Sequence, residues 1–151
     1  MENLKNITRQ SLPNSEYTYL LGACVWVHNS NMQFIKELIC KEYTRDTNDV
    51  SWFELICGMS DGQLLNYKNA IKTKTTEEIY NKINHIIEMR NWIFHSTPSG
   101  EIKDNTPIAI YRNDSKKINK EITLDFMKKF IKENEELSSL IYQERDHKML
   151  K

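Results

Sequence analysis

Apolar residues recur at helical spacing along the first long segment of the chain, from Tyr17 to about Tyr43. A period near 3.6 residues is typical of an amphipathic helix, and the stripe here consists of Tyr17, Leu21, Cys24, Val25, His28, Met32, Ile35 and Ile39. Asn14 or Ser15 is suited to cap the first turn of this helix. The polar segment 1–13 before it is expected to form an arm or a short leading segment.

Three further helices are predicted before the chain changes character, at 51–59, at about 60–72 and at about 76–96. The third of them starts with Thr75 and Glu78, which have the spacing of a capping box. Its apolar face then repeats at helical intervals, through Ile79, Ile83, Ile86, Ile87 and Phe94. This face predicts a helix packed along one side of a bundle.

The segment 99–122 has a different pattern, in which Ile108 and Ile110 alternate with smaller or polar residues. Asn, Asp and Ser at 113–115 favour a turn, so we expect a two-stranded hairpin here. Thr123 can then cap a last helix, whose apolar stripe extends to Ile141.

Together these elements predict a mainly all-α fold, a four-to-five-helix bundle with a small β-hairpin before the last helix. The chain holds only 4 Gly and 3 Pro in 151 residues, which favours a few long elements. Its length fits a single domain, 1–151. The N-terminal residues lack the apolar core of a signal peptide, and no stretch is apolar enough to span a membrane, so we expect a cytoplasmic protein.

The charge and the cysteine content limit which nucleic acids or metals the chain is expected to bind. With 21 basic and 21 acidic residues the formal net charge is +0, so contact with nucleic acid would need a local patch. The densest basic region offers such a patch, or an ordinary solvated face, and consists of Lys116, Lys117 and Lys120 with Lys128 and Lys129. Cys24 lies four residues before His28, but no second pair has metal-ligand spacing, so we predict no metal and no cofactor.

Polar residues of potential chemical use gather near the end of the helix predicted at 76–96. Arg90 interrupts the Ile-rich stripe, and a charge on a core-facing stripe needs a partner or a wet cleft. A second face combines amide, carboxylate and imidazole groups, at Asn84, Glu88, Asn91 and His95, with Ser96 following. Cleaving RNA without a metal needs a proton acceptor for the 2′-hydroxyl, which histidine supplies, and a phosphate contact, which arginine supplies.

The sequence Arg90-Asn91-x-x-x-His95 resembles the RNxxxH form of the Arg-x(4–6)-His motif of HEPN domains (higher eukaryotes and prokaryotes nucleotide-binding). The resemblance implies an all-α bundle, usually dimeric, and in many members a metal-independent endoribonuclease of toxin–antitoxin, abortive-infection or CRISPR-linked systems. It also implies roles for three residues: His95 as general acid or base, Arg90 as phosphate contact and Asn91 as supporting group. Asn84, Glu88 and Ser96 would then line the cleft, and the lysines of segment 116–120 would contact the RNA backbone.

Helix geometry complicates this interpretation, because residues five apart point about 140° from each other. We therefore expect a homodimer, in which two copies of the helix line one shared cleft. The plainer alternatives are an Arg90 paired with a carboxylate and a His95 placed at the negative end of the helix dipole.

Three hypotheses remain open from the sequence. The first is a HEPN-like endoribonuclease, restrained by an antitoxin or another regulatory protein. The second is a non-catalytic HEPN-like module that binds RNA, a nucleotide or a partner protein. The third is an unrelated bundle that serves as a partner-binding or regulatory protein. Its signature would be an apolar surface patch away from 84–96 and no effect of changing His95.

Overall fold

The computed structural model describes residues 7–46 and 75–149. The elements follow in the order α1 (Ser15–Asp46), α5 (Glu77–Phe94), β1 (Thr97–Lys103), β2 (Thr106–Asn113), β3 (Ile118–Ile122) and α6 (Leu124–Met149). The helices expected at about 17–43, at about 76–96 and after Thr123 are thereby confirmed. Those expected at 51–59 and 60–72 lie outside the described residues.

The prediction of an all-α bundle of four to five helices is wrong. The described residues combine three helices with a three-stranded antiparallel sheet of order β1-β2-β3, so the fold is mixed α/β. The expected hairpin is present as β2 and β3, whose register runs from Ala109 opposite Ile122 to Asn113 opposite Ile118. The unexpected strand is β1, which pairs with β2 through a tight turn.

Strand β1 has little of the usual strand signal, which explains why the pattern did not indicate it. It lies at the edge of the sheet, it contains Pro98 and Gly100, and its side chains are almost all exposed. Because proline donates no ladder hydrogen bond, it is found mainly in edge strands, at strand starts and at bulges, and the register of β1 shifts between Pro98 and Ile102. The turn to β2 places Asp104 and Asn105 at φ 51° and 58°, the left-handed backbone that two-residue hairpin turns require.

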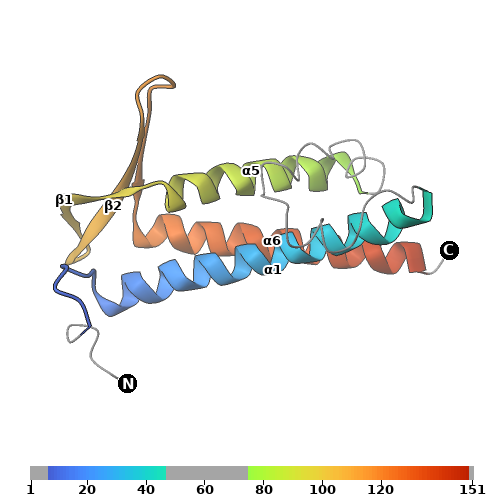
Figure 1. Ribbon diagram of the computed structural model, residues 1–151, viewed down its shortest axis with the longest axis horizontal. Helices are drawn as coiled ribbons and strands as arrows, with labels where there is room; N and C mark the ends of the chain where they lie inside the picture. The colour runs from blue at the N-terminus through green and yellow to red at the C-terminus, as the bar shows by residue number, and fades with distance from the viewer. Residues whose placement is uncertain (1–6, 47–74, 150–151) are drawn as a thin grey trace.

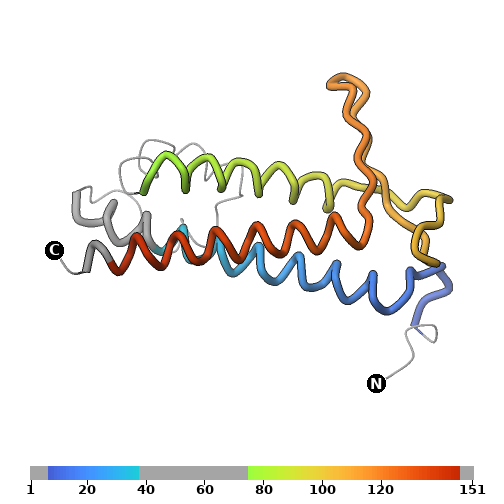
Figure 2. Tube along the Cα trace, turned by 180° about the vertical axis from the view of Figure 1, so that it is seen from behind, coloured from blue at the N-terminus to red at the C-terminus, as the bar shows by residue number. Residues whose placement is uncertain are grey.

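The three helices lie along one another, with the sheet at one end of them (Figure 1). Helices α1 and α6 both start at the sheet and run away from it, whereas α5 runs toward it. The β2–β3 hairpin projects beyond the helices, which the view from behind also shows (Figure 2). The end of α5, both hairpins and the N-terminal segment 7–14 therefore share one end of the molecule.

Side-chain caps explain where the helices begin. The Oδ1 of Asn14 accepts the N–H of Tyr17 at 2.9 Å, and the Oγ1 of Thr123 accepts the N–H of Phe126 at 3.1 Å. At α5 the N-cap is Thr76, whose Oγ1 accepts the N–H of Ile79 at 3.3 Å. The N-cap is therefore Thr76 and not Thr75, and Ile79, three residues on, cannot complete the capping box predicted from Thr75 and Glu78.

The core lies between α1, α5, α6 and the inner face of β2. Its largest fully buried apolar side chains are Phe130, Ile83, Ile86, Met89, Ile122, Met127, Leu137 and Ile141. Two amides join α1 to α6 within it, because the Nδ2 of Asn31 donates to the backbone oxygen of Asn134 at 2.8 Å. The Nδ2 of Asn134 in turn donates to the oxygen of Phe130 at 2.9 Å, so these buried polar groups are satisfied.

Tyr17 inserts its hydroxyl between two strands. Its Oη donates to the backbone oxygen of Ile122 at 2.8 Å and accepts the N–H of Ala109 at 3.1 Å. Ala109 and Ile122 are directly opposed residues of β2 and β3. Burial raises the pKa of Tyr17, which keeps the phenol protonated and able to donate. This contact attaches α1 to the sheet.

A lysine holds α5 to α6 on the outside of the bundle. The Nζ of Lys82 lies 2.7 Å from a carboxylate oxygen of Glu133 and 2.6 Å from one of Glu136. Burial opposes the charge on Lys82, but its hydrogen bonds to the two glutamates outweigh that effect and raise its pKa. The same hydrogen bond from Lys82 lowers the pKa of Glu133 below its usual value of 4.5.

We expect Lys82→Met to lower the free energy of unfolding at pH 7 by about 1 kcal/mol, the upper range for a partly exposed ion pair. Because the pKa of Glu133 is lowered in the folded chain, its contribution is present above pH 4.5 and is lost as the pH falls through the folded value. Urea unfolding at pH 7 and pH 3 would therefore show a difference that shrinks in acid. Lys132→Met, at an exposed position of α6, is the control, and an equal loss in both variants would contradict the prediction.

Candidate functional site

The motif residues lie where α5 gives way to β1. The helix ends at Phe94, and His95 is its C-cap, with φ −101° and ψ 9°. The His95 N–H donates to the oxygen of Asn91 at 3.0 Å, and the Oγ of Ser96 donates to the oxygen of Ile93 at 2.7 Å. These bonds satisfy carbonyl groups that a helix end leaves unpaired, so His95 has a defined backbone position although it is outside the helix.

Arg90 is half-buried, and two of the contacts of its guanidinium bear on the site. Its Nη1 donates to the Oδ1 of Asn91 at 3.1 Å. Its Cζ lies 4.5 Å from the centroid of the Phe94 ring, which is cation–π distance. The sequence predicted Arg90 and Asn91 as site residues but not Phe94, which follows Arg90 by four residues and so lies on the same helix face.

The bond between Arg90 and Asn91 reduces the angular problem raised by the motif spacing. On a helix, Asn91 points about 100° from Arg90 and about 40° from His95. Because the guanidinium donates to the Asn91 amide, it turns toward the face that carries His95. His95 is exposed, and its imidazole makes no side-chain hydrogen bond within residues 7–46 and 75–149.

The three residues expected to support the cleft have more local roles. The Nδ2 of Asn84 donates to the oxygen of Tyr80 at 3.2 Å, within its own helix. Ser96 uses its hydroxyl to close the end of α5. Glu88 is exposed and stands two turns before His95. The structure thus joins Arg90 to Asn91 and leaves the supporting residues as scaffold or solvated face.

The basic residues divide into two groups. Lys116 and Lys117 belong to the turn between β2 and β3, which projects away from the helices (Figure 1). Lys120 is on β3, with its Nζ 4.9 Å from the centroid of the Trp92 ring. Trp92 points about 160° from Arg90 around α5, so Lys120 approaches the opposite side of the helix. The three lysines do not form one patch around the motif.

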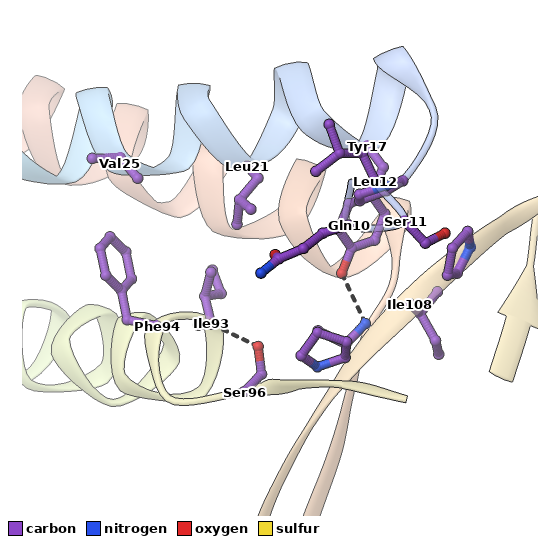
Figure 3. Close-up of a pocket in the computed structure, with 14 residues that line it drawn as sticks. Gln10, Ser11, Leu12, Tyr17, Leu21, Val25, Ile93, Phe94, Ser96 and Ile108 are labelled. Atoms are coloured by element: carbon purple, nitrogen blue, oxygen red, sulfur yellow. Dashed lines mark hydrogen bonds between the residues drawn. The ribbon is translucent and has the colours of Figure 1, made fainter. Parts of the chain in front are cut away.

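A cavity of about 430 Å³ that no sequence pattern predicted lies beside the motif (Figure 3). Its walls come from the N-terminal segment, α1, the end of α5 and the β1–β2 hairpin. One signal was present in the stripe of α1, where Leu21 and Val25 were expected in the core. Leu21 is instead 37% exposed, and both residues form the cavity wall.

The pair Cys24 and His28, considered as metal ligands, is buried between α1 and α6. The thiol of Cys24 lies 3.7 Å from the oxygen of Met127, and burial raises its pKa to about 12. His28 packs with its ring centroid 6.0 Å from that of Phe130. In the described part of the chain no group of three or more His, Cys, Asp or Glu side chains has the geometry of a metal site. Cys40 and Cys57 lie outside the described side chains.

No protein-family model, curated protein or solved structure matches this chain. Among the described residues, no helix is both long and apolar enough to cross a membrane. The geometry at the end of α5 and the motif resemblance are therefore the features that bear on function.

Proposed function

We propose that this chain is an endoribonuclease that cleaves RNA with Arg90, Asn91 and His95. The observation that carries the proposal is the hydrogen bond from Arg90 to Asn91, which directs a phosphate-binding group toward the face of an exposed histidine. The chemistry needs no metal. The 2′ oxygen of a ribose attacks the adjacent phosphorus and its proton passes to a base, while the bond to the 5′ oxygen breaks and that oxygen takes a proton from a general acid or from water. The products are a 2′,3′-cyclic phosphate and a 5′-hydroxyl.

The residues divide these tasks by their chemistry. Histidine titrates near neutrality, so His95 can exchange the proton of the 2′-hydroxyl or of the leaving oxygen. The planar guanidinium of Arg90 stays charged and can bind two phosphate oxygens as negative charge develops. Asn91 orients Arg90 through its amide oxygen and leaves its own Nδ2 available as a donor.

The motif keeps its resemblance to that of HEPN domains, but the fold around it differs from theirs. The motif helix leads within two residues into a β-strand, whereas the resemblance implies an all-α bundle. A homodimer joined near the ends of two α5 helices would add a second His95 to the cleft. RNA as substrate fits a cytoplasmic site of action, and a toxin or defence role would call for an antitoxin or another regulatory protein.

The decisive experiment incubates purified protein with mixed single-stranded RNA in excess EDTA, beside His95→Ala. We expect cleavage by the wild type, with cyclic phosphate at the 3′ ends, and none by the variant. His85→Ala is the matched control, because His85 is an exposed histidine of the same helix, and it should cleave like the wild type.

The same experiment separates cleavage from binding alone. If neither wild type nor His95→Ala cleaves, while both have wild-type circular dichroism and retain labelled RNA in a filter assay, the chain is a binding module and the nuclease proposal is rejected. Equal cleavage by wild type and His95→Ala would also reject it, since the activity would then not depend on the motif.

A further inference from the structure

The cavity beside the motif has the size and lining of a small-molecule site. Its volume of about 430 Å³ falls within the range of natural ligand pockets, which are mostly apolar with a few directed polar groups. Leu21 and Val25 of α1 form one wall, and Ile93 and Phe94 of α5 form the facing wall (Figure 3). An apolar, ring-sized ligand portion would fit between them.

One polar side chain is directed into this space. The amide of Gln10 points between Leu21 and Ile93 in Figure 3, and it makes no side-chain hydrogen bond within the described part of the chain. Two other polar groups of the lining are already engaged, because Tyr17 bridges Ala109 and Ile122 and Ser96 bonds Ile93. An amide presents a donor and an acceptor side by side, which complements the edge of a nucleobase.

Phe94 connects the cavity to the phosphate contact. Phe94 is 39% exposed and lines the cavity, while the guanidinium of Arg90 lies against its ring, 4.5 Å from the centroid. A phosphate bound by Arg90 would therefore lie at the edge of the cavity. A nucleotide carries a phosphate and a flat, partly apolar base on either side of one ribose, so a single nucleotide can occupy both places.

We propose that this cavity binds the base of the nucleotide whose phosphate contacts Arg90. The inference rests on the proposed function, which gives that phosphate its role. The base lies against Phe94 between the walls of α1 and α5, and the amide of Gln10 hydrogen-bonds its edge. The N-terminal segment is then part of the substrate site, and the cavity gives the enzyme a preference among the four bases at one position of the RNA.

The test measures binding by calorimetry on the full chain carrying His95→Ala, so that no substrate is consumed. The probes are AMP, GMP, CMP, UMP, ribose 5-phosphate and inorganic phosphate. We expect at least one nucleotide to bind about 10-fold tighter than ribose 5-phosphate, the effect of a base that is stacked and hydrogen-bonded. Adding Gln10→Ala should weaken that nucleotide by about 5- to 10-fold and leave inorganic phosphate unchanged.

A second variant tests the cavity itself. Val25→Trp places a large ring in the space and should remove the difference between the nucleotide and ribose 5-phosphate, with circular dichroism confirming the fold. Nucleotides that bind no tighter than ribose 5-phosphate, or binding unchanged by both variants, would overturn the inference even if wild-type protein cleaves RNA. Nucleotide binding that Val25→Trp removes would support it even if no RNA is cleaved, in which case only the proposed function fails.

Discussion

Replacing Arg90 with lysine is expected to lower the single-turnover rate of RNA cleavage by about 100- to 1000-fold, the range for loss of one oriented donor to a developing charge. Lysine keeps the positive charge but has no planar fork, so it cannot bind two phosphate oxygens together. It also loses the geometry that places the guanidinium on Phe94 and against the Asn91 amide. The variant thus separates the shape of the arginine from its charge.

The matched control for this experiment is Arg112→Lys, because Arg112 is an exposed arginine of β2. It should retain the wild-type rate, and both variants should be compared by thermal unfolding. A rate for Arg90→Lys within threefold of the wild type would show that charge alone suffices and that the Arg90–Asn91 geometry has no part in cleavage. A loss of rate that simply follows a loss of folded protein would assign Arg90 to stability.

Changing Tyr17 to phenylalanine is expected to lower the free energy of unfolding by about 2–4 kcal/mol. The change removes one hydroxyl but leaves two backbone groups, the N–H of Ala109 and the oxygen of Ile122, without the partner they have in the wild type. A buried donor or acceptor left unsatisfied costs about 1–3 kcal/mol. The strands cannot easily close over the gap, because the phenyl ring still occupies the space between α1 and the sheet.

Urea unfolding followed by circular dichroism measures this change. Tyr19→Phe is the control, because Tyr19 is 74% exposed on the same helix, and it should alter stability by less than about 0.5 kcal/mol. If Tyr17→Phe destabilises the chain no more than Tyr19→Phe does, the strands recover their own hydrogen bond and the bridging role is refuted.

The helices could be predicted from the sequence because their signals are local. The stripe from Tyr17 to Ile35 and the Ile-rich face of α5 repeat every three or four residues, and the caps at Asn14 and Thr123 are short polar side chains just before them. Such periodicity depends on burial along one face, which any compact arrangement of the helices satisfies. The pattern therefore located α1, α5 and α6 without specifying what packs on their ends.

The fold class could not be predicted because β1 depends on its neighbour. A segment with Pro98 and Gly100 and almost no buried side chain becomes a strand only because β2 offers it an edge. Its clearest local signal is the pair Asp104 and Asn105, whose positive φ angles suit a tight hairpin turn. That signal marks a turn and does not by itself indicate a third strand.

Part of the candidate site could be predicted from the sequence. Arg90, Asn91 and His95 stand out because their spacing resembles a motif and because Arg90 interrupts an apolar stripe. Gln10 has no such signal, since it lies in a polar segment without periodicity. Its place in the cavity lining is seen only in the folded structure. Leu21 and Val25 have the spacing of core residues. In the structure they line the cavity opposite the end of α5.

The bridge made by Tyr17 has a consequence for how the chain folds. Its partners lie 92 and 105 residues further along the sequence, whereas β2 and β3 are joined by a four-residue turn, 114–117. The hairpin can form early, but its Ala109–Ile122 position is completed only after the cost of closing a long loop has been met. We therefore expect α1 to dock and the sheet to be completed in one late cooperative step, because neither Tyr17 nor the Ala109–Ile122 position has its native hydrogen bonds without the other.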